Sequence, residues 1–416
     1  MTPRLRLSLS RAAVSGMLLL ACGDPEVDDA GSAGIPNQIF APCDTIGSMY
    51  GDTCDTFGTI AEVEIMPDGG VAVLDGIASR IRFYDSGDSY LGSVGGKGSG
   101  PGEFLYPTSF TFLEGGGLAV SDWSARTIWM FDDSMNFRGD LGHFDPGAPS
   151  PIESAGDGYI LGQSMSMQSG ESGLTGESYL GLWRESPDPE VIFHSSPLEI
   201  SMSGEDRIEI GYQRLLFDSD SVGNVYMAQV SDSSYSLTAF RRTGELLFEV
   251  DAPWERIPRT DAEMALERDL QYQEAETGDI PAYRNAIEGL FVSGKGEIWV
   301  RRGSSLHPAF DVYSSSGDLL YMADIPCLED TLFRMQFASA GSLLVAWDID
   351  PVDYPKVIFF KSEGRPNAIE THIASEDGKG GGTPRPFWQE AIPDGCSPGL
   401  FLLLSGSLCF CACYSE

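Results

Sequence analysis

The stretch VEIMPDGGVAVLD (residues 63–75) is followed, after a short gap, by a second stretch of similar form, SRIRFYDSGDSYLGSVG (residues 79–95). In each, an apolar segment runs into a turn rich in Gly, Asp and Ser and then continues as another apolar segment. Such a pattern is typical of antiparallel strands, and the glycines supply the positive φ that tight hairpin turns need. Together the two stretches predict a unit of four short antiparallel strands.

This unit recurs along the chain. Further copies begin with FTFLEGGGLAVSD (110–122), PIESAGDGYILGQ (151–163), RLLFDSDSVGNVYMAQV (214–230), EGLFVSGKGEIWVRR (288–302) and RMQFASAGSLLVAWD (334–348). Four-stranded units that repeat about every 45 residues indicate the blades of a propeller. A β-sandwich would not explain the common register in which the copies start. We therefore predict an all-β fold, a six-bladed β-propeller with four-stranded antiparallel blades.

One segment interrupts the β pattern between the predicted blades four and five, at about residues 260–286. Thr260 and Glu263 have the spacing of a capping box, and Ala262 and Leu266 belong to an apolar stripe at helical spacing. These residues predict a helical insertion. Because an apolar helix face needs an apolar partner, we expect the helix to cover one mouth of the propeller or to decorate its rim.

The glycine-rich segment GGKGSGPGEFLYP (95–107) invites comparison with a phosphate-binding loop. A dinucleotide fingerprint requires a following helix whose N-terminus meets the phosphate, whereas here Pro107 and a β-rich segment follow. A Walker A loop is excluded as well, because Gly98 rather than Ser or Thr follows Lys97. We therefore assign the glycines to a tight crossing between two blades.

This crossing resembles the inter-blade linker of NHL-repeat propellers, whose pattern is G-x-x-G-x-G-P-G-x-F-x-x-P. The matching residues are Gly95, Gly98, Gly100, Pro101, Gly102, Phe104 and Pro107. The linker recurs only faintly, as LGHFDPGAPSP (141–151), and is lost from the later copies. More broadly, the chain from about residue 40 to residue 362 resembles bacterial six-bladed, TolB-like propeller lipoproteins. This resemblance implies a propeller that presents loops for binding. Some six-bladed relatives are instead metal-dependent hydrolases or lyases with calcium or zinc in the channel.

The first residues have the form of an export signal, in which arginines precede a short apolar region. The sequence LLAC (19–22) resembles a bacterial lipobox, which implies removal of residues 1–21 and a lipid anchor on Cys22. An ordinary secretory signal that ends by chance at a cysteine is the alternative. Residue 23 is Gly and not the Asp that retains lipoproteins at the inner membrane. We expect a protein of the bacterial cell envelope, at the outer rather than the inner membrane, either periplasmic or exposed on the surface.

The predicted domain order follows from these segments. A flexible acidic tether (22–40) leads into the propeller (41–364), and a linker with a poorly ordered, Cys-rich tail (365–416) ends the chain. Cys43 and Cys54 are close enough in sequence to form a disulfide at the start of the propeller. The tail has four cysteines but no second half-site nearby, so we predict no metal site there.

The formal net charge of -36 disfavours nucleic acid as a partner, because such a surface repels phosphate backbones. We expect the partner to be a protein or a small ligand such as a peptide or a sugar, the membrane to be contacted through the lipid anchor, and the chain to be monomeric. No cofactor is predicted. A divalent cation such as calcium would be needed only if the chain were an enzyme.

Polar residues at the end of the second strand of each unit are the candidate ligand-binding residues. They are Asp75, Asp122, Gln163, Gln229, Arg301, Arg302 and Asp348. Equivalent positions in a propeller converge near one face, so these side chains are expected to surround a funnel. The alternative is a structural role, with Asp75 paired to Arg80 and Asp122 paired to Arg126 within their hairpins.

No catalytic residue is assigned, because the hydrolase elbow G-x-S-x-G and the zinc motif H-E-x-x-H are both absent from the sequence. The two arginines and the amides among the candidates argue against a cation in the funnel. The sequence therefore favours a binding or protein-interaction scaffold over an enzyme. The alternative is a metal-dependent hydrolase or lyase with its site in the central funnel.

Overall fold

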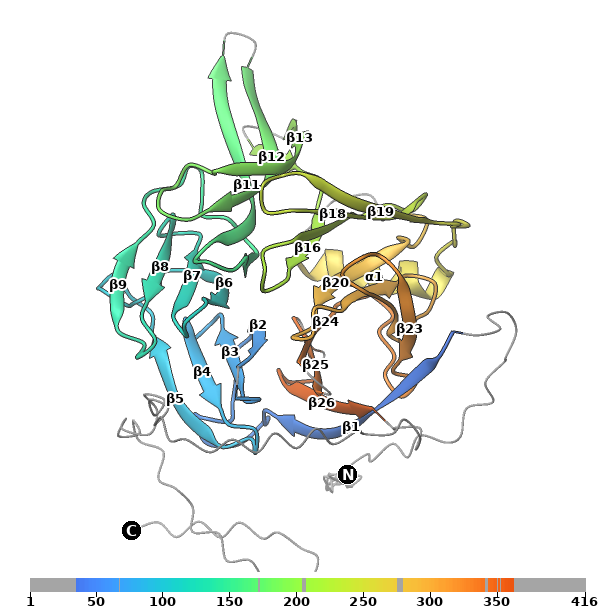
Figure 1. Ribbon diagram of the computed structural model, residues 1–416, viewed down its shortest axis with the longest axis horizontal. Helices are drawn as coiled ribbons and strands as arrows, with labels where there is room; N and C mark the ends of the chain where they lie inside the picture. The colour runs from blue at the N-terminus through green and yellow to red at the C-terminus, as the bar shows by residue number, and fades with distance from the viewer. Residues whose placement is uncertain are drawn as a thin grey trace, which may run out of the picture.

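The computed structural model describes residues 35–362, apart from positions 67, 171–172, 204–206, 275–279, 341–342, 350 and 352. The predicted signal segment, Cys22, most of the tether and the C-terminal tail lie outside these residues. The described chain is all-β with a single α-helix, and its sheets are arranged as a propeller (Figure 1).

Four of the sheets contain four antiparallel strands each, paired in chain order. The first holds β2 (Ile60–Ile65), β3 (Val71–Asp75), β4 (Arg80–Tyr84) and β5 (Tyr90–Gly95). The second holds β6 (Pro107–Phe112), β7 (Leu118–Asp122), β8 (Thr127–Phe131) and β9 (Phe137–Asp140). The third holds β10 (Ile152–Ser154), β11 (Ile160–Gly170), β12 (Gly173–Trp183) and β13 (Val191–Pro197). The fourth holds β16 (Leu215–Ser219), β17 (Val225–Gln229), β18 (Tyr235–Phe240) and β19 (Leu246–Ala252).

A fifth sheet has eight strands in the order β20-β21-β22-β23-β1-β26-β25-β24. Its later strands in the chain are β20 (Ile287–Val292), β21 (Ile298–Arg302), β22 (Ala309–Tyr313), β23 (Leu319–Asp324), β24 (Met335–Ala340), β25 (Leu343–Asp348) and β26 (Val357–Ser362). Strand β1 (Asn37–Ile46) joins the two halves. It pairs in parallel with β23 over Asn37–Ile39 and then antiparallel with β26. The first described strand thus closes the ring against the last.

The first strand of each repeated unit lies at the centre of the propeller. Neighbouring inner strands contact one another around a closed ring, in the order β2, β6, β10, β16, β20, β24 and back to β2. These strands begin the units that the sequence repeat predicted. Hydrogen bonding divides the described strands differently from the predicted six blades, into four four-stranded sheets, one eight-stranded sheet and one two-stranded sheet.

The core consists of apolar layers between neighbouring sheets. Between the first and second sheets, the fully buried ring of Phe104 packs edge-on against Phe131, with ring centroids 6.0 Å apart. Phe104 comes from the glycine-rich crossing, whose Gly95 lies beside this ring with φ of +88°. A Cβ at Gly95 would lie 2.2 Å from the ring of Phe104. The crossing leads into β6, so no helix follows it.

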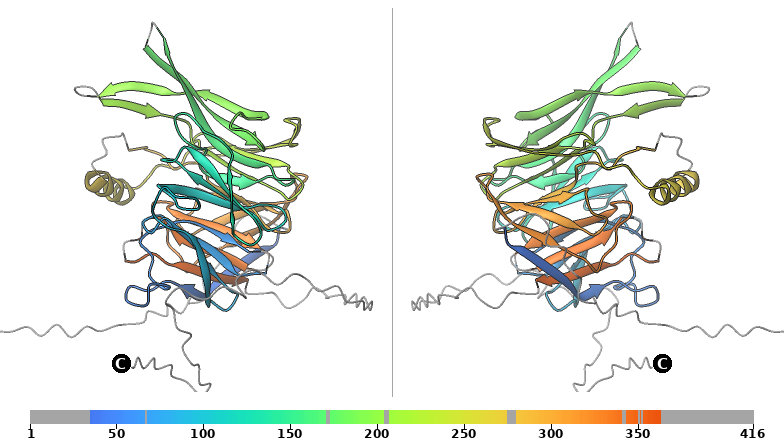
Figure 2. Two further views of the ribbon diagram at one scale, coloured as in Figure 1. Left: turned by 90° about the vertical axis from the view of Figure 1, so that its left-hand side faces the viewer. Right: turned by 90° about the vertical axis from the view of Figure 1, so that its right-hand side faces the viewer.

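Two insertions project from the same side of the disc (Figure 2). One is a hairpin of β14 (Glu199–Ser203) and β15 (Arg207–Gly211), between the third and fourth sheets. The other carries helix α1 (Asp261–Glu274), between β19 and β20.

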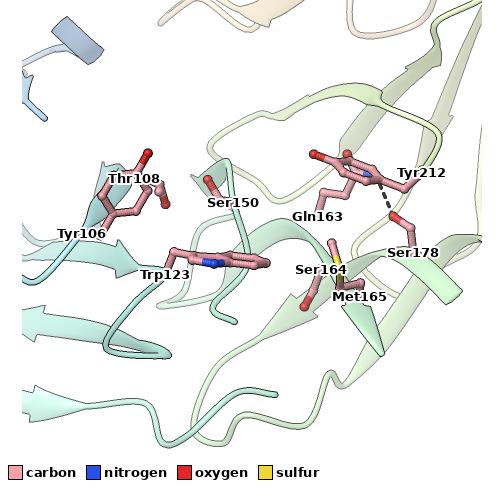
Figure 3. Close-up of a pocket in the computed structure, with 9 residues that line it drawn as sticks. All are labelled: Tyr106, Thr108, Trp123, Ser150, Gln163, Ser164, Met165, Ser178 and Tyr212. Atoms are coloured by element: carbon pink, nitrogen blue, oxygen red, sulfur yellow. Dashed lines mark hydrogen bonds between the residues drawn. The ribbon is translucent and has the colours of Figure 1, made fainter. Parts of the chain in front are cut away.

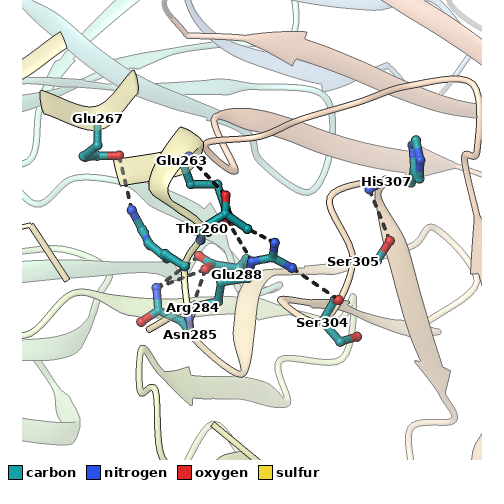
Figure 4. Close-up of polar contacts among 10 residues, drawn as sticks. Thr260, Glu263, Glu267, Arg284, Asn285, Glu288, Ser304, Ser305 and His307 are labelled. Atoms are coloured by element: carbon teal, nitrogen blue, oxygen red, sulfur yellow. Dashed lines mark hydrogen bonds and ion pairs between the residues drawn. The ribbon is translucent and has the colours of Figure 1, made fainter. Parts of the chain in front are cut away.

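Helix α1 begins with the predicted capping box. The Thr260 N–H donates to Glu263 Oε2 at 2.8 Å, and the Glu263 N–H donates to Thr260 Oγ1 at 3.2 Å. The predicted apolar stripe, however, is not buried, since Ala262, Ala265 and Leu266 are exposed. The helix is instead held through its polar side (Figure 4), where the buried Glu263 carboxylate receives two hydrogen bonds from the guanidinium of Arg284.

The predicted disulfide between Cys43 and Cys54 is not formed. Cys43 is an exposed free thiol, at a register shift between Pro42 and Asp44 in the β1–β26 ladder. Cys54 is buried and belongs to a different disulfide. Cys43 is thus exposed at an irregularity of β1, whereas Cys54 is buried. Among the described residues, no helix has the length and apolar character needed to cross a bilayer.

Candidate functional site

A pocket of about 320 Å³ lies between the second and third sheets. It is lined by Tyr106, Thr108, Trp123, Ser150, Gln163, Ser164, Met165, Ser178 and Tyr212 (Figure 3). Its volume is at the lower end of the range for small-molecule sites, roughly 300–1,000 Å³. Figure 3 shows Trp123 between two groups of side chains, with Tyr106 and Thr108 on one side and Gln163, Ser178 and Tyr212 on the other.

The pocket's aromatic residues are held by backbone contacts near strand ends. Trp123 directly follows β7, and its N–H donates to the carbonyl of Tyr106 at 3.1 Å. Gly147 packs against the indole so closely that a Cβ there would lie 2.6 Å from Trp123 Cε3. Tyr106 and Tyr212 remain 57% and 51% exposed. Backbone contacts therefore position Trp123 beside Tyr106, while both tyrosines keep about half of their surface accessible.

Asp122, a predicted site residue, is not among the residues that line the pocket. Its buried carboxylate accepts hydrogen bonds from the N–H groups of Leu105 at 2.7 Å, Tyr106 at 3.0 Å and Ala125 at 2.9 Å. The carboxylate thereby holds the loop that carries Tyr106 against the strand that leads to Trp123. Its role is to position the two aromatic residues.

Gln163 is the one predicted residue that lines the pocket. Its Nε2 donates to Ser178 Oγ at 2.9 Å and to the Gln213 carbonyl at 2.7 Å, and its Oε1 accepts from the Leu215 N–H at 3.2 Å. These bonds tie β11 to β12 and to the segment that enters β16. Tyr212, which also lines the pocket, directly precedes Gln213 in the chain.

The other predicted residues make structural contacts elsewhere. Asp75 repeats the pattern of Asp122 in the first sheet. It accepts from the N–H groups of Gly58 and Ala78, and it pairs with Arg82 at 3.0 Å rather than with Arg80. Arg126 pairs with Asp145 rather than with Asp122. The hairpin pairs expected from sequence are therefore replaced by other partners.

The remaining candidates lie at strand ends and are not among the residues that line the pocket beside Trp123. Gln229 is exposed and accepts from Gln213 Nε2 at 3.1 Å. Arg301 is fully buried and pairs with Asp330 at 2.9 Å. Arg302 lies 3.4 Å from Asp324, and Asp348 ends β25.

A second cavity, of about 280 Å³, lies among the inner strands. Four carboxylates line it, contributed by Glu62, Glu64, Glu153 and Asp218. Three of them accept backbone N–H groups from the next inner strand: Glu62 from Phe110 at 2.5 Å, Glu64 from Phe112 at 3.3 Å and Asp218 from Val292 at 2.5 Å. Inner strands have an unpaired edge, and these carboxylates satisfy part of it.

We call this second cavity the channel. Burial raises the pKa values of all four carboxyl groups that line it. It raises the pKa of Glu64 to about 8 and that of Asp218 to about 7. Burial, together with the neighbouring carboxylates, raises the pKa values of Glu62 and Glu153 well above the usual range. No basic residue lines this cavity in the described part of the chain. Within the same described ranges, no three His, Cys, Asp or Glu side chains are grouped so as to hold a metal ion.

Sequence reasoning missed the aromatic residues and the channel carboxylates. Tyr106 and Tyr212 lie shortly before the inner strands β6 and β16, and Trp123 directly follows β7. An alignment of the repeated units by their strand ends would have drawn attention to these aromatic residues. Glu62 and Glu64 alternate on an inner strand. Acidic side chains two residues apart on an otherwise apolar strand were the available signal for the channel.

Solved structures that resemble this chain include the following three. A protein from Bacteroides fragilis considered to be exported is 13% identical, with 78% of this chain and 96% of that chain covered and a TM-score of 0.43. Virginiamycin B lyase from Staphylococcus aureus is 11% identical, with 78% and 90% covered and a TM-score of 0.37. A calcium-binding protein, regucalcin, from Agrobacterium tumefaciens is 9% identical, with 79% and 97% covered and a TM-score of 0.36. No protein-family model matches the chain, and no curated protein matches it in sequence.

Proposed function

We propose that this chain is a six-bladed propeller that acts as a binding module outside the cytoplasm, with its ligand site in the pocket beside Trp123. The blade count treats the eight-stranded sheet as two blades, β20–β23 and β24–β26 with β1. The closed ring of inner strands supports this count, because each of those strands begins one set of four.

The observation that carries the binding proposal is the pair of half-exposed tyrosines flanking a fixed tryptophan at a pocket of ligand size. Exposed aromatic surface is costly to leave in water and is typical of recognition sites. The surrounding backbone contacts hold the rings in place before a ligand arrives, which reduces the entropy cost of binding.

The cellular address is proposed from the sequence. Lipidation of Cys22 would anchor the module in the bacterial cell envelope, and the residue after Cys22 favours the outer membrane. The propeller would then face the periplasm or the cell surface. Acyl-chain labelling of the full-length protein in cells, with Cys22→Ser as the control variant, tests this address.

The alternative, a hydrolase or lyase that uses a divalent cation in the central funnel, would have to draw on the channel carboxylates. Three of the four already accept backbone N–H groups, which supports a structural role for them. We therefore favour the binding function. Metal analysis of the purified protein tests the alternative, since a tightly held cation whose removal abolishes an activity would favour the enzyme.

The proposed site is tested with a library of neutral small molecules, followed by ligand-observed NMR on the full-length protein. We expect binders whose signal is lost in the variant Trp123→Ala and retained in Tyr50→Ala. Tyr50 is 87% exposed and does not line the pocket, so its loss controls for the removal of a surface aromatic residue. Binding that is unaffected by Trp123→Ala would place the site elsewhere.

A further inference from the structure

We infer that the pocket beside Trp123 recognises an uncharged carbohydrate. This inference rests on the proposed binding function and names the class of ligand. It follows from the kinds of side chain that line the pocket, from their free hydrogen-bonding groups and from the charge around them.

The aromatic side chains of the pocket are suited to the apolar C–H face of a sugar ring. A pyranose ring presents a flat face of C–H groups, which packs favourably on the π-face of Trp or Tyr. The lining contains Tyr106, Trp123 and Tyr212, whereas Met165 is the one aliphatic-type side chain among the described residues that line it. A site for a branched apolar ligand would be expected to have more aliphatic lining.

The hydroxyl groups of the pocket are suited to hydrogen bonds with the hydroxyl groups of a sugar. The side chains of Ser150 and Ser164 line the cavity and place two hydroxyl groups at its surface. Ser178 Oγ accepts from Gln163 and keeps its own proton for a further bond. The hydroxyl of Thr108 is buried without a partner in the same part of the chain, which carries a free-energy cost. Ligand hydroxyls can both donate and accept, so they can satisfy such a set.

Charge excludes the other common classes of polar ligand. Among the residues that the structure describes, no Asp, Glu, Lys, Arg or His side chain lines the pocket. The formal net charge of -36 repels anionic ligands at longer range. A phosphorylated or carboxylated ligand would therefore lack a partner and be repelled, and a cationic ligand would find no carboxylate in the pocket itself.

A proline-rich peptide is the nearest competing ligand, because such peptides also bind between aromatic side chains. They dock as extended chains along grooves, whereas this cavity has a volume of about 320 Å³ and suits a compact ligand. The observations therefore favour the carbohydrate.

The test compares three probe series on the full-length protein by saturation-transfer NMR and calorimetry. The neutral series is maltose, cellobiose and N,N′-diacetylchitobiose. The anionic series is the galacturonic acid disaccharide, and the peptide series is an acetylated and amidated oligoproline. Each series is measured on the wild type, on Trp123→Ala, on Ser164→Ala and on the control Tyr50→Ala.

We expect at least one neutral disaccharide to bind, with affinity at least tenfold weaker in Trp123→Ala and unchanged in Tyr50→Ala. Ser164→Ala removes one hydroxyl and little volume, so it should weaken binding severalfold while the melting temperature stays at the wild-type value. This variant keeps the test decisive if Trp123→Ala fails to fold.

The possible failures are distinguishable. If only the oligoproline binds, and does so in a Trp123-dependent way, the carbohydrate inference is overturned while the proposed binding function stands. If the anionic disaccharide binds as well as the neutral ones, the inference is also overturned. If no probe of any series binds at millimolar concentration, both the inference and the proposed site fail.

Discussion

At the residue scale, Asp75 and Asp122 occupy equivalent positions in two blades and both hold a loop in place, but only the loop held by Asp122 carries a pocket residue. Asp75 and Asp122 each end a second strand and accept N–H groups from the loop that enters their own sheet. The sequence repeat located both residues but assigned them to a ligand funnel. A buried carboxylate surrounded by backbone N–H groups is satisfied by the protein, and sequence alone does not show which N–H groups fold back onto it.

The pair provides a matched test of positioning. Asp122→Asn should lower the free energy of unfolding by about 1–3 kcal/mol, because it leaves buried N–H groups poorly satisfied. Asp75→Asn should cost more, about 3–5 kcal/mol, because it also leaves the buried Arg82 without its charged partner. Only Asp122→Asn should also weaken ligand binding in the pocket, since only Asp122 holds the loop of Tyr106. Urea denaturation and calorimetry with the best neutral probe measure the two effects. Equal loss of binding in both variants would contradict the positioning role.

At the scale of elements, the glycine-rich crossing requires glycine for a steric reason. Gly95 has φ of +88°, and a Cβ there would lie 2.2 Å from the buried ring of Phe104. Gly95→Ala should therefore lower the free energy of unfolding by about 2–5 kcal/mol, through backbone strain and overpacking together.

Gly115 is the control for backbone strain alone. Its φ is +89°, and nothing lies within 4 Å of a Cβ built there. Gly115→Ala should lose only about 1–2 kcal/mol. Both variants are compared by chemical denaturation. Similar losses would mean that contact with Phe104 contributes little to the requirement for glycine at position 95.

Helix α1 shows what sequence could and could not predict about an element. The capping box of Thr260 and Glu263 is a local pattern, and the structure contains it. The contact that anchors the helix is not local, because Arg284 lies beyond the end of the helix in the chain. The apolar stripe therefore suggested a buried face, while the buried side is set by an ion pair that no helical periodicity reveals.

Breaking this ion pair should release the helix. Glu263→Gln leaves the buried Arg284 without its charged partner, a change that typically costs about 3–5 kcal/mol. We expect the loss as faster hydrogen exchange over α1, with little change in global unfolding, because the insertion stands off the disc. The control Glu267→Gln affects a pair that is more exposed on the carboxylate side and should cost less than about 1 kcal/mol. Unchanged exchange in Glu263→Gln would contradict the anchoring role.

The Glu263 carboxylate should also make the local stability of α1 depend on pH. Burial opposes the charged form, but hydrogen bonds from Arg284 and Thr260 lower the pKa of Glu263 to about 2. A lowered pKa in the folded state means that the contribution is present above the unfolded value near 4.5 and is lost as pH falls towards 2. Hydrogen exchange over α1 should therefore rise relative to the propeller between about pH 4 and pH 2, and the rise should be absent in Glu263→Gln.

At the scale of the whole molecule, the repeat predicted the order of strands but not the way the ring closes. Strand β1 lies before the first repeated unit in the chain and pairs with both β23 and β26. Its closing role depends on contacts across the full length of the propeller, and the repeat pattern carries no information about them. The channel arises in the same way, because Glu64, Glu153 and Asp218 belong to different blades and meet only once the ring is closed.

The closed channel should make stability depend on pH in the direction opposite to that of Glu263. The pKa of Glu64 is raised from 4.5 to about 8, so between these values the folded protein holds a proton that the unfolded chain has released. The contribution of Glu64 to the free energy of unfolding is therefore full below about pH 4.5 and is lost as pH rises towards 8.

Glu64→Gln stays neutral at every pH and can still accept the Phe112 N–H, so its stability should match that of the wild type near pH 5. By pH 9 it should exceed the wild type by on the order of 1–3 kcal/mol, a range that allows for screening and for the coupled carboxylates. Urea denaturation across this pH range measures the difference.

The control Glu185→Gln removes an exposed charge instead, so its stability relative to the wild type should show no comparable rise with pH. A constant difference between Glu64→Gln and the wild type would mean that Glu64 is already ionised in the folded protein near pH 5, and that the channel tolerates its charge.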